Sequence, residues 1–169
     1  MLVDINGDIK PMANFTYFTL KELCASDVAT QRRIDNFPSF TIVEHLNELT
    51  EKILEPLRIA WGSSIIVNSG YRCDALNRAV GGVSTSAHRL GYAADLFPGN
   101  GKIDEFGKFV KEWLIKNRVK FDQVLFETKD KKRWVHIGIR STSGSQRYRS
   151  ISTYPLDLKV TPSSSNNVR

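Results

Sequence analysis

The sequence is poor in cysteine. Its 169 residues include two, Cys24 and Cys73, and neither belongs to a CxxC pair. Two cysteines do not make a disulfide framework. Cys24 lies among apolar residues and is predicted to be a core residue. No neighbouring base supports Cys73 as a nucleophile.

Long apolar runs are also missing. No segment approaches the roughly 18 residues that a membrane-spanning helix needs, so membrane insertion is not expected. The first residues, MLVDINGDIKPMANF, lack the basic region and apolar stretch of a secretory signal. If the protein acts outside the cytoplasm, something other than a standard signal must release it.

The charge balance is basic, but no nucleic-acid motif accompanies it. The net charge is +6, and the densest basic cluster, KDKKR at 129–133, is short and contains an aspartate. No zinc-finger, P-loop or RNA-binding signature is found, so nucleic acid is not an expected partner. A hydrophobic content of 41% and a charged content of 25% are typical of one globular domain. Nothing indicates an obligate partner, and we expect a monomer.

The hydrophobic periodicity predicts an α+β fold, with helices before and between strands and a hairpin near the end. Helices are predicted over residues 18–26, 41–61, 73–82 and 103–117, and strands over 64–72, 93–97, 123–127 and 133–139. Residues 27–39 are predicted to be a polar loop, and Pro56 to kink or break the second helix. The polar segment TKDKK should join the last two strands as an antiparallel hairpin.

The composition changes after Ile139, where serine, threonine and arginine dominate. We therefore predict a domain over residues 1–140, with its core at about 18–140, followed by a C-terminal arm over 141–169. The arm is expected to contribute one strand or an extended segment near YPLDLKV. Its end, PSSSNNVR, is typical of disorder.

Histidine is scarce, and each of the three has a distinct setting. His45 lies at the edge of the apolar stripe of the helix over 41–61, which favours a packing role. His136 belongs to the alternating strand WVHIGI, on the face opposite the aliphatic residues. His88 lies in STSAHRLGYAADL, where Asp95 follows after a glycine turn.

His88, Asp95 and His136 together form a ligand set suited to catalytic zinc, with a fourth position left for water. Asp95 lies between Ala94 and Leu96, and a carboxylate that enters an apolar strand needs a compensating cation. The alternative is a capped turn that leads into a buried strand, with no metal.

Two further charged residues fit a hydrolytic site. Arg72 follows the strand IIVNSGY, where it could bind a substrate carboxylate or an oxyanion; the alternative is a surface ion pair. Glu127 ends the strand QVLFE and could act as general base; the alternative is pairing with Lys131 or Arg133.

Three segments carry a family resemblance. SGYR (69–72), SAHRLGYAADL (86–96) and WVHIGI (134–139) together resemble the zinc D-Ala-D-Ala carboxypeptidases, peptidase family M15. The middle segment matches the family pattern S-x-H-x-x-G-x-A-x-D at every signature position. The similarity runs from about FTLKEL to HIGI and is closest to the short branch found in phage lysis enzymes and bacterial proteins. The fold is shared with the hedgehog amino-terminal domain.

The resemblance implies a small antiparallel sheet that carries one zinc ion, held by His88, Asp95 and His136. It implies that Arg72 contacts the substrate or the transition state and that Ser86 lines the pocket. The implied substrate is the peptide of bacterial peptidoglycan, cut by a D,D-carboxypeptidase or an endopeptidase. The competing function is a non-catalytic, zinc-containing module of the same fold that binds cell walls or serves as a phage structural part.

The sequence departs from the family at one position. Many members carry an acidic residue three positions before the last histidine, where this chain has Arg133. Glu127 matches the relatives that place the acid earlier, with Asp130 as the alternative base. Because no secretory signal is recognised, we expect a protein made in the cytoplasm that reaches the cell wall through a holin-like pore, an injection apparatus or lysis.

Overall fold

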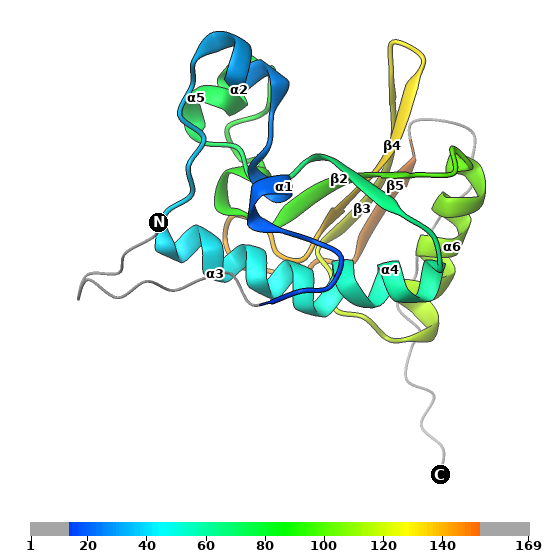
Figure 1. The fold of residues 1–169 in the computed structure, drawn as a ribbon. Coiled ribbons are helices and arrows are strands. Elements are labelled where there is room, and N and C mark those ends of the chain that lie inside the picture. The colour runs from blue at the N-terminus through cyan, green and yellow to red at the C-terminus, as the bar shows by residue number, and fades with distance from the viewer. Residues whose placement is uncertain (1–13, 153–169) are drawn as a thin grey trace.

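A five-stranded sheet organises residues 14–152, the part of the chain that the computed structural model describes (Figure 1). In spatial order the strands are β1 (Ile65–Ser69), β2 (Ala93–Pro98), β4 (Lys132–Gly138), β3 (Gln123–Lys129) and β5 (Arg149–Ser152). The first four are antiparallel to their neighbours, and β5 runs parallel to β3. The predicted α+β class with a small, mostly antiparallel sheet is confirmed.

The helices lie on one face and at the ends of this sheet (Figure 1). They are α1 (Leu20–Cys24), α2 (Asp27–Arg32), α3 (Phe40–Leu49), the π-helical turn η1 (Thr50–Leu54), α4 (Glu55–Trp61), α5 (Asp74–Ala79), the 3₁₀ turn η2 (Ala87–Leu90) and α6 (Ile103–Lys116). α3, η1 and α4 form one continuous rod along the sheet, while α2 and α5 gather at one end. Over the described residues, no helix has the length and apolarity to cross a membrane.

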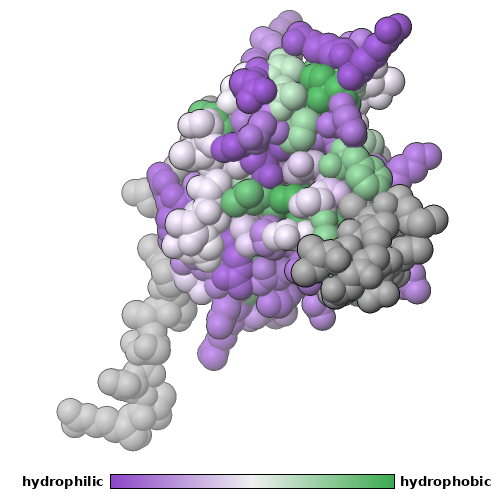
Figure 2. All heavy atoms as spheres, turned by 90° about the vertical axis from the view of Figure 1, so that its left-hand side faces the viewer, coloured by the Kyte–Doolittle hydropathy of each residue, from purple (hydrophilic) through white to green (hydrophobic). Residues whose placement is uncertain are grey.

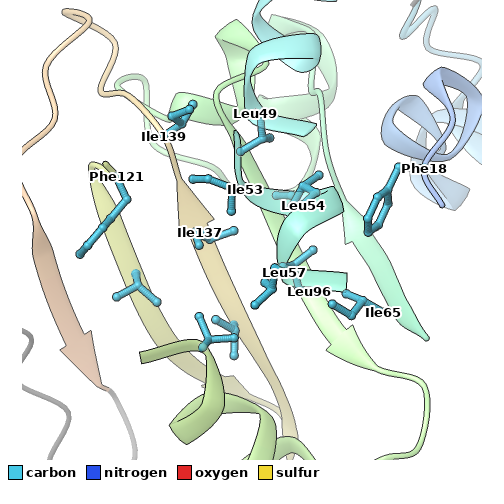
Figure 3. Close-up of a cluster of buried hydrophobic side chains, with 14 of the residues drawn as sticks. Phe18, Leu49, Ile53, Leu54, Leu57, Ile65, Leu96, Phe121, Ile137 and Ile139 are labelled. Carbon is cyan, nitrogen blue, oxygen red and sulfur yellow. The ribbon is translucent and has the colours of Figure 1, made fainter. Parts of the chain in front are cut away.

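The core lies between the rod and one face of the sheet. Alternate strand residues point toward the rod and are fully buried, among them Leu96, Val124, Phe126, Val135 and Ile137. They meet the apolar stripe of the rod, and Figure 3 shows Leu49, Ile53, Leu54 and Leu57 in this layer. Because the side chains of a strand alternate, the intervening residues point away from the core. The opposite face of the sheet is thus left for polar side chains.

The rod does not break at Pro56. The chain widens into the π-helical turn just before it, and the Glu55 N–H bonds to the Thr50 carbonyl. A π-helical turn accommodates the proline ring and its missing donor without ending the helix. The helix ends at Gly62, which adopts the left-handed conformation (φ 72°).

Two segments differ from the prediction. The loop predicted over 27–39 was wrong in its first half, because Asp27–Arg32 form α2, capped by the Ser26 hydroxyl on the Ala29 N–H (3.2 Å). The polar joint TKDKK is also shorter than expected. The two strands continue through Lys129 and Lys132, and Asp130 and Lys131 alone make the turn, both with positive φ. That conformation suits the right-handed twist of a two-residue hairpin.

The predicted arm contributes β5 at Arg149–Ser152, whereas YPLDLKV and PSSSNNVR lie outside the described residues. Two bidentate ion pairs attach the segment before β5 to the rest of the fold: Arg140 to Glu48 of α3 (2.7 and 2.9 Å) and Arg147 to the buried Asp122 (2.6 and 2.7 Å). Residues 141–148 are therefore attached to the preceding domain, and Arg149–Ser152 join its sheet. The division of the chain at residue 140 stays a prediction.

Candidate metal centre

Three side chains from three elements converge on the face of the sheet away from the core. His88 Nε2 lies 3.2 Å from Asp95 Oδ1 and 3.2 Å from His136 Nδ1, and those two atoms are 2.8 Å apart. Four-coordinate zinc with bonds of about 2.0–2.1 Å places its ligand atoms roughly 3.3 Å apart. These three atoms form a triangle with the dimensions of one face of such a coordination shell. The triangle of His88, Asp95 and His136 could therefore hold a metal ion.

Strand pairing and a glycine turn build the triangle. Asp95 on β2 is the direct cross-strand partner of His136 on β4, so both side chains share one face. His88 reaches them from η2, which ends at Gly91 in the left-handed conformation (φ 71°). The Gly91 N–H closes η2 on the carbonyls of Ala87 and His88. The expected chain reversal at Gly91 is therefore present.

The His88 ring is held in one orientation. Its Nδ1 donates to the Gly70 carbonyl (2.7 Å), which leaves Nε2 directed at the other two residues. Burial lowers the pKa of His88, which favours the neutral ring that a metal requires. A hydrogen bond such as the one from His88 Nδ1 to the Gly70 carbonyl commonly orients histidine ligands in metal sites.

The carboxyl of Asp95 has a lowered pKa although its side chain is only 15% exposed. Burial alone would raise the pKa of this carboxyl, but His88 and His136 more than offset it and hold the pKa well below its usual range. With Nδ1 of His88 protonated, its Nε2 lone pair faces a carboxylate oxygen and a second imidazole nitrogen. Electron-pair donors directed at one point are stabilised by a cation between them. The residues present thus fit a bound metal ion.

Arg72 lies against the triangle, directly beyond β1. Its Nη2 is 3.7 Å from Asp95 Oδ2, and its backbone N–H donates to the His88 carbonyl (3.0 Å). Its Nε is buried and has no hydrogen-bond partner among the described residues. Burial lowers the pKa of Arg72, while the charges of Asp95 and Glu127 oppose that shift. The alternative of a surface ion pair does not describe a side chain that is only 14% exposed.

Glu127 faces the same cleft from β3. It pairs across the hairpin with Trp134, and its Oε2 accepts a hydrogen bond from the indole Nε1 (2.9 Å). Arg133 is not its partner, since that side chain bonds instead to Asp104 (2.7 and 3.1 Å). Asp130 lies at the hairpin turn and is not among the residues that line the cleft.

The triangle opens into a cleft of about 970 Å³ that also contains Arg72, Ser86 and Glu127. On one side α2, α5 and the chain before η2 contribute apolar residues, Val28, Leu76, Val80 and Val83. Figure 2 shows hydrophobic atoms over this end of the molecule with hydrophilic atoms around them. The other side is polar and comes from β3 and the segment Ser141–Arg149.

Sequence analysis missed several of these contacts. No sequence pattern indicated that the Gly70 carbonyl would contact His88, or that Ser141–Arg149 would form part of a second, polar wall of the cleft. The extra residue in β1, between Val67 and Ser69, is a bulge that turns Asn68 and Ser69 toward the cleft. The Trp134 contact did have a signal, because Trp134 shares the strand face of His136.

The remaining candidates pack as expected. His45 bonds to the Leu90 carbonyl (2.7 Å) and to the Tyr92 hydroxyl (2.9 Å), and its ring stacks on Tyr92. Cys24 packs against the core, and burial raises the pKa of its thiol to about 12. Cys73 begins α5, where its Sγ accepts from the Leu76 N–H (3.4 Å).

A family model described as Peptidase M15 matches residues 16–138. The matched segment includes His88, Asp95 and His136 together with Arg72, Ser86 and Glu127, and it ends before the cleft-lining segment Ser141–Arg149. No curated protein sequence matches the chain.

Proposed function

This chain belongs to the peptidase M15 family, a family of metal-dependent peptidases, and we propose that it is a zinc enzyme that hydrolyses peptidoglycan peptides. The cleaved bond would lie in a stem peptide or a cross-link, so the enzyme is a D,D-carboxypeptidase or an endopeptidase. The observation that carries the proposal is one cleft in which His88, Asp95 and His136 lie beside Glu127 and Arg72.

Zinc suits the donor set of the centre. Two imidazoles and one carboxylate leave a fourth position free, which is the arrangement of catalytic rather than structural zinc sites. When bound there, zinc lowers the pKa of a coordinated water and polarises a peptide carbonyl. His88, Asp95 and His136 would hold the ion through Nε2, Oδ1 and Nδ1, the three atoms that face one another.

Glu127 is the proposed general base. The Trp134 indole engages one of its carboxylate oxygens, which fixes the side chain and leaves the other oxygen for a water in the cleft. Glu127 takes the proton of the attacking water and delivers it to the leaving amine. Glu127 suits that role better than Asp130 does, because Glu127 lines the cleft and Asp130 lies at the hairpin turn.

Arg72 is the proposed partner of developing negative charge. Its unpartnered, buried Nε and its long contact with Asp95 leave donors that can bind the oxyanion or a substrate carboxylate. Ser86, at the start of η2, lines the cleft and can hydrogen-bond the substrate backbone. Since neither side chain is saturated by protein partners, both are available to a ligand.

The test is mass spectrometry of purified peptidoglycan fragments incubated with the zinc-loaded protein, with and without a chelator. Release of D-Ala identifies a carboxypeptidase, and loss of cross-linked dimers identifies an endopeptidase. Glu127→Ala should abolish either product while it keeps bound zinc, measured by atomic emission. Asp95→Ala should lose the metal as well as the activity.

Glu112→Ala, an exposed glutamate on α6, is the matched control and should behave as the wild type. Bound zinc with no change in any fragment would contradict the proposal and favour the non-catalytic, wall-binding module. A fully active Glu127→Ala would instead remove Glu127 as the base.

A further inference from the structure

The second, polar wall of the cleft combines β3 with a segment that follows the family match. The match ends at residue 138, whereas Ser141, Thr142, Ser143, Arg147 and Arg149 line the cleft. This wall is held firmly in place. The buried Asp122 accepts from the backbone and the guanidinium of Arg147, and its carbonyl accepts from the Arg149 N–H (2.8 Å).

Arg149 differs from the other arginines of its segment. Arg147 is neutralised by Asp122, and Arg140 by Glu48. Arg149 is exposed, lines the cleft and has no carboxylate partner within residues 14–152. The nearest acids of the cleft are already engaged, Asp122 with Arg147 and Glu127 with Trp134. Arg149 therefore presents an unneutralised guanidinium to any ligand there.

The strand register places Arg149 relative to the metal centre. Leu125 of β3 pairs with His136 on one side and with Ile151 of β5 on the other, and Arg149 lies two residues before Ile151. Two strand spacings and two residues along β5 separate the backbones of His136 and Arg149 by roughly 12 Å. Glu127 lies two residues beyond Leu125 in the opposite direction along β3. Glu127 and Arg149 thus lie on opposite sides of the line that runs across the strands through His136 and Leu125.

We propose that Arg149 is a specificity-determining residue that binds a substrate carboxylate two or three residues from the cleaved bond. The inference rests on the proposed function and adds the chemistry of the distant end of the substrate. An extended peptide spans at most about 3.3–3.6 Å per residue, so three residues or fewer bridge the gap once the arginine side chain is included. A guanidinium binds a carboxylate through two parallel hydrogen bonds, which gives both charge and orientation.

The test uses two synthetic stem peptides, L-Ala-γ-D-Glu-L-Lys-D-Ala-D-Ala, that differ at one group. In one the α-carboxyl of the glutamyl residue is free, and in the other it is a carboxamide. The zinc-loaded wild type should show a kcat/KM about five- to tenfold higher for the free carboxylate, the size expected of one charge-assisted contact. Arg149→Gln should lose that preference, because its kcat/KM for the free carboxylate falls to about its value for the carboxamide.

Arg118→Gln is the matched control, because Arg118 is exposed and follows α6 outside the cleft. It should keep the wild-type preference. Equal rates on both peptides in the wild type, or a preference that survives in Arg149→Gln, would overturn the assignment.

Binding separates this proposal from the proposed function. If the wild type hydrolyses neither peptide, D,D-carboxypeptidase activity on this stem is excluded, and calorimetry with the same peptides still tests Arg149. A carboxylate preference in affinity that Arg149→Gln abolishes supports the subsite. Equal or undetectable binding of the two peptides would contradict the proposed carboxylate subsite at Arg149.

Discussion

Gly91 connects the buried rod to a proposed metal ligand, and Gly91→Ala should damage both stability and metal affinity. Gly91 ends η2 three residues after His88 and has a φ of 71°. A Cβ built there would lie 3.0 Å from the Ile42 carbonyl oxygen and 3.1 Å from Leu46 Cγ. Both atoms belong to α3, whose packing against the core leaves them little room to move.

The expected cost has two parts. The left-handed conformation costs an alanine about 1 kcal/mol relative to glycine. The contact with α3 adds about 1–2 kcal/mol, because the obstructing Ile42 oxygen is backbone and cannot rotate away. If η2 shifts to relieve that contact, His88 moves with it. We therefore expect a total loss of about 2–3 kcal/mol and a fall in zinc affinity of about tenfold or more.

Gly62→Ala is the matched control. Gly62 also ends a helix with a φ of 72°, but nothing lies within 4 Å of its added Cβ. It should lose only the conformational part, about 1 kcal/mol, with unchanged zinc affinity. Urea unfolding of the metal-free proteins measures the first quantity, and competition with a chromophoric chelator measures the second. Equal destabilisation in the two variants would show that contact with α3 adds nothing to the cost of Gly91→Ala.

Two further predictions follow from hydrogen bonds already described. Trp134→Phe removes the indole donor from Glu127, and kcat should fall about fivefold with zinc content unchanged; an unaltered kcat would contradict a positioning role. The Arg140 hydrogen bonds lower the pKa of Glu48 to about 2, so this pair stabilises the fold above about pH 4.5 and less as the pH falls toward 2. Wild type should lose about 1–2 kcal/mol more than Glu48→Gln between pH 5 and pH 2 in urea unfolding of metal-free protein; equal losses would exclude the pair.

The features that the sequence predicted correctly depend on short-range patterns. Alternation along WVHIGI placed Val135 and Ile137 in the core and His136 on the opposite face, as the structure has them. The apolar stripe of the residues before Gly62 likewise predicted the buried rod. In each case one residue's environment follows from its near neighbours and from the period of the element.

The features that were missed depend on contacts between distant segments. β5 was not predicted at 149–152, because its parallel pairing with β3 is decided by the Asp122–Arg147 anchor and has no repeat of its own. The polar wall over 141–149 follows from that pairing. α2 was a different kind of error, since Ser26 followed by Asp27 is a recognisable helix start that the polar composition obscured.

The surroundings of Glu127, the proposed base, depend on a turn that the neighbouring residues do not predict. Arg133 is an odd number of residues from His136, so on a regular strand it must face away from the metal centre, and it bonds to Asp104 there. Glu127 faces away from the core because it follows the buried Phe126 on β3, and the two-residue turn at Asp130 and Lys131 sets it opposite Trp134. A turn that also took in Lys132 would set Glu127 opposite Val135, and the hydrogen bond from the Trp134 indole would be lost. A dipeptide without glycine or asparagine does not indicate a two-residue turn, so the pairing of Glu127 with Trp134 is a property of the folded hairpin.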